Sequence, residues 1–393
     1  MMRTIGTKAM GIRTPIIREG DDLVEIVKNS LLEAEKYDGV SFSDRDIVGI
    51  TEAVVARAQG NYANLQQIAA DVRGKIPQGT VGVVFPILSR NRFSMLLKGI
   101  AMGADRVVVQ LSYPADEVGN ELISRDMLYE KEIDPYSTLM TEGEFRSVFG
   151  NETVHKFTGI DYIEYYKSLN PNIEIILGND PRHILKYTKQ VICADIHSRK
   201  HTERVLKRAG ADIVLGLDDF LSKPVLGSGF NEEYGLLGSN KASEDRVKLF
   251  PRGCDDIVTR LARALKEATG KEFEVLIYGD GGFKDPVGGI WELADPVISP
   301  AFTPGLAGTP NEIKLKYIAD NKFAQLKGEE ARRAIVEEIK KKSVSLYGKA
   351  ESEGTTPRQI TDLLGSLCDL ISGSGDKGTP VVLIQGYFDN YAS

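Results

Sequence analysis

One acidic turn in the sequence has the composition of a metal or phosphate site. Residues 274–278 (EVLIY) form an expected strand, and the segment GDGGFKD (279–285) follows it directly. Hard carboxylate oxygens at the end of a strand suit Mg²⁺ or Mn²⁺, and the glycines would let phosphate oxygens approach the backbone. A simple Asp-Gly tight turn is the alternative. The pattern makes Asp280 a candidate metal ligand.

A second candidate is the glycine-rich segment GSGDKGT (373–379), which lies between an expected helix and the last expected strand, 381–384. Closely spaced glycines can present several backbone N–H groups to an anion. The segment lacks the G-x-x-x-x-G-K-[ST] spacing of a P-loop. The alternative interpretation is a helix C-cap with a flexible connector.

A third group contains Asp195, His197 and His201. Histidines four residues apart at a helix start can bind Zn²⁺, but Arg199 and Lys200 lie between them and cations disfavour a metal. A surface pair, or a phosphate-facing edge shared with Arg199 and Arg182, is favoured over the metal. The sequence has no G-x-S-x-G and no C-x-x-C, so it gives no support to hydrolase or thiol redox chemistry.

The elements that must position these residues alternate between strands and helices. One unit has strands at 81–85 and 107–111 around a helix at 92–102, and a second has strands at 191–194 and 213–215 around a helix at 200–209. Both units carry a Ser-Arg pair after the first strand and a Gly-Ala-Asp turn before the second. They are either a duplication or two generic units. With a further strand at 173–177 between them, they predict an α/β fold with a parallel or mixed sheet.

The remaining helices are expected at 21–36, 65–72, 255–268, 329–346 and 357–371, and a short strand at 46–50 runs into a helix that ends near residue 60.

Composition narrows the class of protein. The chain has 393 residues, 42% hydrophobic and 27% charged, with a net charge of −7. These values exclude a mostly disordered chain and a dedicated nucleic-acid binder. The longest apolar stretch, residues 81–88, is far shorter than the roughly 18–20 residues that span a bilayer. Three widely spaced cysteines and the absence of a signal-peptide pattern predict a cytoplasmic protein without membrane association.

Five segments of the chain together resemble the γ-glutamyl ligases of coenzyme F-420, the deazaflavin coenzyme. They are residues 11–23 (GIRTPIIREGDDL), 46–60 (DIVGITEAVVARAQG), 235–240 (GLLGSN), 274–289, and 360–386, which ends in GTPVVLIQG. The first and last segments are the most specific. The resemblance implies an α/β (mixed α+β) ligase-like fold with mixed sheets and an extra α/β middle region.

The resemblance also implies an activity. Members of this family add L-glutamate to a carboxylate on the deazaflavin side chain, using GTP and Mg²⁺ or Mn²⁺, through an acyl phosphate. The partners would be the nucleotide, glutamate and a small carboxylate acceptor, and the expected assembly is a homodimer. Two alternatives stay open, namely a ligase for another acceptor such as a folate, and a catalytically silent nucleotide-binding relative.

Carried over position by position, the resemblance implies a set of site residues. Asp280 and Arg57 would be catalytic. The nucleotide would contact Thr14, Pro15, Ile16, Ile17, Arg57, Asn240, Gly373, Ser374, Gly375, Asp376 and Gly378. Leu237 and Ser374 stand where the family has acidic metal ligands, so Asp285 and Asp376 join Asp280 as the candidate metal ligands. The residues at 14–17 and 373–379 should then meet at one site.

The expected division of the chain is a ligase-like portion at 1–120, an elaborated α/β region at 121–230, and a second ligase-like portion at 231–393. The middle region has two possible roles. Its loops could border the acceptor pocket, with Arg182, Arg199, Lys200 and Arg204 attracting an anion, or its outer face could form a dimer contact.

Overall fold

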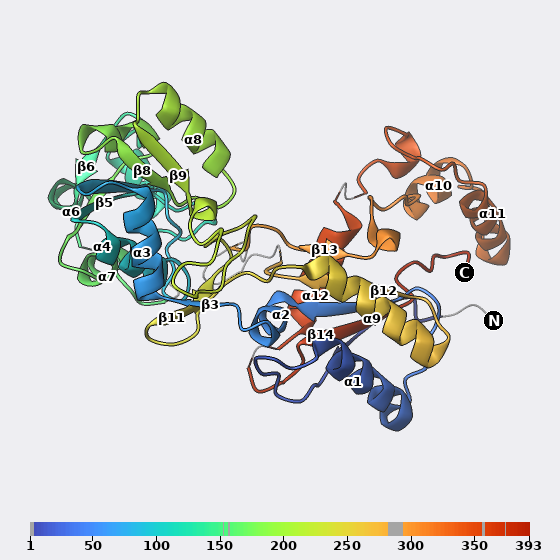
Figure 1. Cartoon of the computed structure of the whole chain (residues 1–393). Helices are drawn as coiled ribbons and strands as arrows, with labels where there is room; N and C mark the ends of the chain where they lie inside the picture. The colour runs from blue at the N-terminus through green and yellow to red at the C-terminus, as the bar shows by residue number, and fades with distance from the viewer. Residues whose placement is uncertain (1–3, 152, 156–157, 282–293, 356–357, 374) are drawn as a thin grey trace.

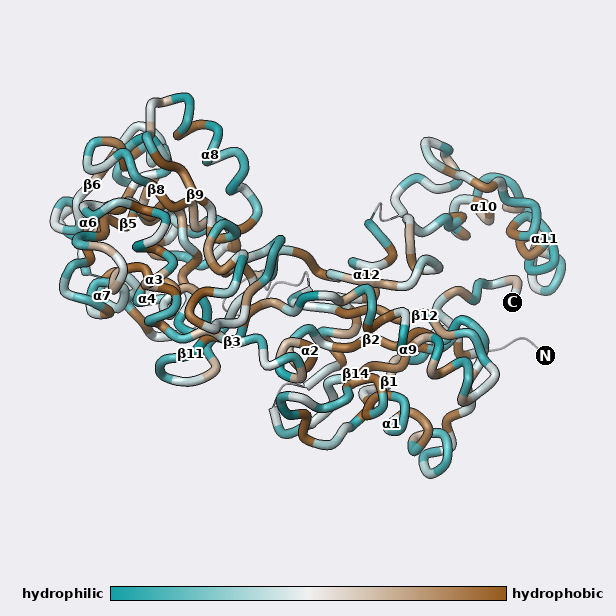
Figure 2. The backbone as a smooth tube through the Cα atoms, in the orientation of Figure 1, coloured by the Kyte–Doolittle hydropathy of each residue, from teal (hydrophilic) through white to brown (hydrophobic). Residues whose placement is uncertain are grey.

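The computed structural model describes residues 4–151, 153–155, 158–281, 294–355, 358–373 and 375–393. Figure 1 shows two α/β lobes joined by extended chain, with a small helical extension beside the lobe that holds both termini. Figure 2 shows hydrophobic residues concentrated on the strands inside both lobes. No helix of the described residues is both long and apolar enough to cross a membrane. The predicted mixed α/β fold class is confirmed.

The lobe that contains both termini is built on a mixed five-stranded sheet. We call it the ligase lobe, because most of the segments that resemble the ligase family lie in it. Its strand order is β1 (Lys8–Ile12), β14 (Val381–Gln385), β2 (Asp46–Thr51), β12 (Phe273–Tyr278) and β13 (Ala301–Phe302). Only the pair of β2 and β12 is parallel. The first and last strands of the chain are therefore neighbours, which brings the two terminal segments to one place.

Helices cover both faces of this sheet. They are α1 (Leu23–Asp38), α2 (Glu52–Ala58), α9 (Cys254–Thr269) and α12 (Ile360–Ile371). Successive side chains of a strand point to opposite faces. Val48 and Ile50 of β2 therefore pack with α1 and α9, whereas Ile47 packs with α12. Gly49 lies directly against Cys368 of α12.

The second lobe, here the doubly wound lobe, contains a six-stranded sheet. Its strand order is β6 (Met140–Thr141), β7 (Ile173–Leu177), β5 (Arg106–Leu111), β4 (Thr80–Val84), β8 (Gln190–Cys193) and β9 (Ile213–Gly216). All pairs are parallel except the edge pair of β6 and β7. The five parallel strands follow the 3-2-1-4-5 order of doubly wound sheets. The predicted boundary at residue 120 stays a prediction, and this sheet takes strands from both sides of it.

Helices flank this sheet too. They are α3 (Leu65–Lys75), α4 (Phe93–Gly103), α5 (Arg125–Glu130), α6 (Glu142–Phe149), α7 (Tyr162–Ser168) and α8 (Arg199–Arg208), with short 3-10 helices at Pro181–Lys186 and Leu217–Asp219. Val83 of β4 packs in the core with α3 and α4, and its neighbour Val84 packs on the opposite face with α8.

A small antiparallel sheet lies between the lobes and consists of β10 (Asn240–Lys241), β11 (Arg246–Lys248) and β3 (Tyr62–Asn64). The helical extension contains α10 (Leu315–Asn321) and α11 (Gly328–Lys340). The charged helix expected at 329–346 ends earlier, at Lys340. The three cysteines are free and buried.

Candidate functional site

A cavity of about 660 Å³ opens where the ligase lobe meets the small sheet. It collects most of the residues proposed from the sequence as nucleotide contacts. Those that line it are Thr14, Pro15, Ile16, Ile17, Arg57, Asn240, Gly373, Gly375 and Gly378. The expected meeting of residues 14–17 with glycines 373, 375 and 378 is confirmed. We call this space the nucleotide cavity, after the contacts that the sequence analysis expects there.

The pairing of the terminal strands creates one wall of this cavity. The Thr51 N–H donates to the carbonyl of Pro380 over 3.0 Å, and the Gly373 N–H donates to Thr379 Oγ1 over 3.0 Å. Gly378 has a φ of +64°, in the left-handed region that favours glycine. These contacts hold Gly373, Thr379 and Pro380 beside the end of β2, at the edge of the cavity.

The charge of the nucleotide cavity is positive. Arg57, Lys241, Arg246 and Lys248 line it, and no described residue of the lining is a carboxylate. Arg246 lies over the ring of Tyr62, with its guanidinium carbon 4.7 Å from the ring centroid. In a chain with a net charge of −7, such a concentration of cations favours a polyanion.

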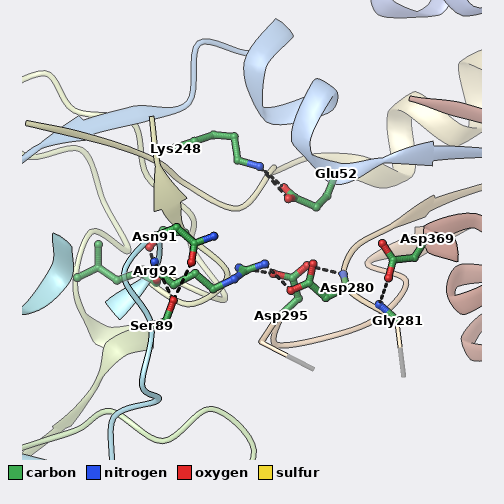
Figure 3. Close-up of polar contacts among 11 residues, drawn as sticks. Glu52, Ser89, Asn91, Arg92, Lys248, Asp280, Gly281, Asp295 and Asp369 are labelled. Carbon is green, nitrogen blue, oxygen red and sulfur yellow. Dashed lines mark hydrogen bonds and ion pairs between the residues drawn. The ribbon is translucent and has the colours of Figure 1, made fainter. Parts of the chain in front are cut away.

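Asp280, the candidate metal ligand, lies outside the nucleotide cavity in an ion-pair cluster with Arg92 and Asp295 (Figure 3). Arg92 extends from the loop after β4, pairs with Asp280, and donates to Asp295 Oδ1 over 2.8 Å. The Asp280 N–H donates to Asp295 Oδ2 over 2.6 Å. Burial acts to lower the pKa of Arg92, but the charges of Asp295 and Asp280 outweigh this effect and raise the pKa above its usual value. The guanidinium therefore stays charged.

Glu52 and Lys248 form a separate buried pair beside this cluster (Figure 3). Their side chains are 5% and 8% exposed, and Lys248 Nζ lies 2.7 Å from Glu52 Oε1. Burial raises the pKa of Glu52, and the charge of Lys248 opposes that shift. Glu52 begins α2, whose last turn carries Arg57, so the pair fixes the helix that presents Arg57 to the cavity.

Of the other candidate metal ligands, Asp285 and Asp376, only Asp376 is among the described residues. Asp376 is exposed and does not line the nucleotide cavity. Ser374 and Asp285 lie outside the described residues. Within the described part of the chain, no group of three or more His, Cys, Asp or Glu side chains is placed to hold a metal ion. The zinc alternative for Asp195, His197 and His201 thus gains no support.

Asp195 serves a structural purpose instead. Its side chain is buried, and Oδ2 accepts hydrogen bonds from Ser198 Oγ and Thr202 Oγ1, both over 2.7 Å. Burial raises the pKa of Asp195 to about 6. The arginines expected to attract an anion are also engaged, since Arg199 pairs with Asp218 and Arg182 with Asp180.

A second cavity, of about 760 Å³, adjoins the first. Lys241 lines both, and Asp280 and Arg92 line the second. The sequence did not indicate Arg92 or Lys241 as site residues. Arg92 pairs with Asp280 and Asp295, and Lys241 contacts Asn91, and all these partners are distant in the chain. The Ser-Arg pair at 89–90 was the one local signal of this region, and both residues line the second cavity.

The sequence model of the F420-0:gamma-glutamyl ligase family matches residues 11–386, nearly the whole chain. The chain therefore belongs to the F420-0:gamma-glutamyl ligase family. A search of proteins with curated functions finds no match.

Proposed function

We propose that this protein joins L-glutamate to a carboxylate of an acceptor molecule with cleavage of GTP, as an F-420-0:L-glutamate ligase. Membership of the family supports the ligase class. The observation that carries the nucleotide assignment is the nucleotide cavity, whose described lining contains four cations, three glycines of the 373–379 segment and no carboxylate. Arg57 and Arg246 are the two of these cations that have no ion pair with a described carboxylate, whereas Lys241 pairs with Glu244 and Lys248 with Glu52. Cationic side chains and backbone N–H groups are the donors that a triphosphate requires.

The proposed reaction proceeds in two displacements. An acceptor carboxylate oxygen attacks the γ-phosphorus, the bond to the β,γ-bridging oxygen breaks, and GDP leaves. The amine of glutamate then attacks the acyl carbon, the amide forms, phosphate departs with the carboxylate oxygen, and the amine proton passes to solvent. Arg57, Lys241 and Arg246 line the cavity where the charged phosphates would lie. Positioning and electrostatic stabilisation dominate such transfers.

A divalent cation would neutralise phosphate charge in this reaction. Asp280 is the described residue proposed to hold it. Its carboxylate is 24% exposed, opens on the second cavity and has the hard oxygens that Mg²⁺ or Mn²⁺ prefers. Arg92 now supplies the positive charge beside Asp280 and Asp295. The donor type therefore fits a divalent ion, in exchange for one Arg92 contact.

The test is a ligation assay of the full chain with F-420-0, L-glutamate, GTP and Mn²⁺, followed by mass spectrometry. The proposal expects an acceptor that is heavier by one glutamate residue, with one GDP formed for each amide. Product with a folate but none with F-420-0 would establish the other acceptor. GTP binding without any ligation would establish the silent relative.

We further propose that the protein is a homodimer and lies in the cytoplasm. Size-exclusion chromatography with light scattering tests the dimer.

A further inference from the structure

The small sheet presents one polar face to the nucleotide cavity. Successive side chains of a strand point to opposite faces. In β11, Arg246 and Lys248 line the cavity, whereas Val247 between them is 1% exposed and packs in the core of the doubly wound lobe. Lys248 lies opposite Tyr62 of β3 and Asn240 of β10, and both neighbours line the cavity too. The register of the three strands therefore turns Lys248 toward the cavity.

Lys248 nevertheless forms a buried ion pair. Its ammonium group donates hydrogen bonds to both carboxylate oxygens of Glu52, over 2.7 Å and 3.0 Å. Glu52 lies at the start of α2, faces Lys248 and lines neither cavity (Figure 3). An ammonium group has three N–H donors. Glu52 takes two of them, so the third is available to a ligand in the cavity.

A pair of this kind contributes little to the stability of a fold. Taking two charges out of water costs about as much free energy as their attraction returns, and apolar side chains of similar volume are often equally or more stabilising. Burial raises the pKa of Glu52, and the nearby charge of Asp295 raises it too, whereas Lys248 and Arg92 lower it. The pair is therefore better explained by its effect on the cavity than by a gain in stability.

The two partners act on the cavity in opposite directions. Lys248 adds a positive charge to a wall that Arg57 and Arg246 also form, and Glu52 places a negative charge directly behind it. Glu52 thus holds the ammonium group in one position and offsets its charge. A phosphate at this wall would accept the third N–H of Lys248, and the carboxylate behind it would repel that phosphate.

We infer that Lys248 binds the phosphates of the nucleotide, and that Glu52 is a positioning residue that directs Lys248 to the cavity and limits the affinity for the nucleotide. The identification of the ligand as a nucleotide rests on the proposed function. The role of the pair rests on its burial and on the register of the small sheet, and it applies to any polyphosphate in this cavity.

Two single variants should shift the affinity in opposite directions. Lys248→Met removes the ammonium group and should weaken GTP binding about tenfold, the lower end of the loss expected when a hydrogen bond to a charged group is removed. Glu52→Gln keeps the shape but removes the negative charge, and it should strengthen GTP binding several-fold. If the pair acted only by fixing the helix of Arg57, both variants should weaken GTP binding. Isothermal titration of the full chain with GTP and Mg²⁺ measures both affinities.

The double variant Glu52→Met, Lys248→Met removes the pair without leaving one buried charge alone. It should melt at the wild-type temperature or above it, because apolar side chains replace a buried ion pair, and it should bind GTP more weakly than the wild type. Lys266→Met is the matched control, since Lys266 forms an exposed pair with Glu272 in the same lobe and lines neither cavity. It should leave the GTP affinity unchanged.

The outcomes distinguish this inference from the proposed function. A double variant that binds GTP as tightly as the wild type, or a Glu52→Gln variant that binds it more weakly, overturns the inference. Inorganic tripolyphosphate is the second probe. If the wild type binds tripolyphosphate but not GTP, and the single variants shift that affinity in opposite directions, the role of the pair stands and the nucleotide assignment falls. If the wild type binds neither probe, both fall.

Thermal melting of each variant confirms that it is folded. If a single variant does not fold, the double variant decides the question by its GTP affinity.

Discussion

Arg57 and Arg92 show how differently two arginines of one site can be placed. Arg57 is exposed at the nucleotide cavity, and no described carboxylate lies within ion-pair distance of it. Arg92 is 13% exposed and already holds two aspartates. The first is therefore free to bind an anionic ligand, and the second organises the acidic turn. Their substitutions should have distinct effects.

Arg57→Met keeps the aliphatic stem and removes the charge. The expected result is a loss of GTP affinity by a factor of about 10–100, because a hydrogen bond to a charged group contributes about 1.5–3 kcal/mol. Isothermal titration of GTP in the presence of Mg²⁺ measures it. Arg57→Lys is the control, and it should recover part of the affinity since the charge remains. An Arg57→Met variant with wild-type affinity would remove Arg57 from the site.

Arg92→Gln should increase affinity for Mn²⁺. The substitution takes a cation away from Asp280 and Asp295, so a divalent ion no longer competes with a guanidinium for Asp280. Leaving the buried Asp295 without its partner should also lower the free energy of unfolding, by about 3–5 kcal/mol. Electron paramagnetic resonance of free Mn²⁺ measures the binding.

The double variant Arg92→Gln, Asp280→Ala is the control for that experiment. It should bind Mn²⁺ more weakly than the Arg92→Gln variant and more weakly than the wild type. If Asp280→Ala left Mn²⁺ affinity unchanged in both backgrounds, Asp280 would not be a metal ligand.

At the scale of elements, local pattern predicted most strands. The strand expected at 173–177 coincides with β7, and the strand expected at 274–278 falls within β12. These segments are apolar runs bounded by turn residues, which sequence alone identifies.

The Arg92 cluster joins residues about 190 positions apart, and Asp116 connects two loops. Such contacts depend on how the lobes fold together, and no local pattern contains them.

The packing of α12 on β2 gives a prediction at this scale. A Cβ at Gly49 would overlap Cys368 Sγ. Gly49→Ala should therefore lower the free energy of unfolding by about 1–3 kcal/mol, the usual effect of overpacking. Cys368→Ala in the same chain removes the sulfur and should restore much of the loss. Chemical denaturation of the four species measures this, and simple additivity of the two changes would contradict the contact.

The loops that Asp116 joins should respond to pH. Burial raises the pKa of Asp116 to about 6 from its usual 3.8. An acid whose pKa is raised by folding favours the folded state when protonated, so its contribution is full below pH 3.8 and is lost as pH rises through 6. By the size of that shift, the loss is on the order of 3 kcal/mol. Asp116→Asn should abolish this component.

The measurement is the difference in unfolding free energy between wild type and Asp116→Asn from pH 4 to pH 7. Asp195, which titrates in the same window, cancels in the difference. The wild type should lose its relative stability as pH rises. A difference that stays constant with pH would show that Asp116 is not protonated in the folded chain near pH 5.

At the scale of the whole molecule, the two cavities belong to two lobes and meet at Lys241. Its side chain is 35% exposed, and its N–H donates to the carbonyl of Asn91 over 2.5 Å, which fixes the small sheet to the doubly wound lobe. The ligase lobe would supply the nucleotide, and the doubly wound lobe would supply the acceptor. Lys241 should therefore contribute to the binding of both the nucleotide and the acceptor.

Lys241→Met should accordingly weaken GTP and F-420-0 alike, each several-fold, because Lys241 lines both cavities and its ammonium pairs only with the exposed Glu244 among the described carboxylates. Arg57→Met should weaken GTP alone. Titration of both variants with both ligands gives the comparison. An effect of Lys241→Met on one ligand only would mean that the cavities do not share this charge.

The most direct test of the account follows one oxygen atom. F-420-0 labelled with ¹⁸O in both oxygens of its carboxylate is incubated with the full chain, GTP, Mn²⁺ and L-glutamate, and the released phosphate is analysed by mass spectrometry. Activation of the carboxylate by the γ-phosphate predicts one ¹⁸O in phosphate for each amide formed, because the phosphate departs with the carboxylate oxygen. Amide formation with unlabelled phosphate would contradict the acyl phosphate, and with it the proposed reaction.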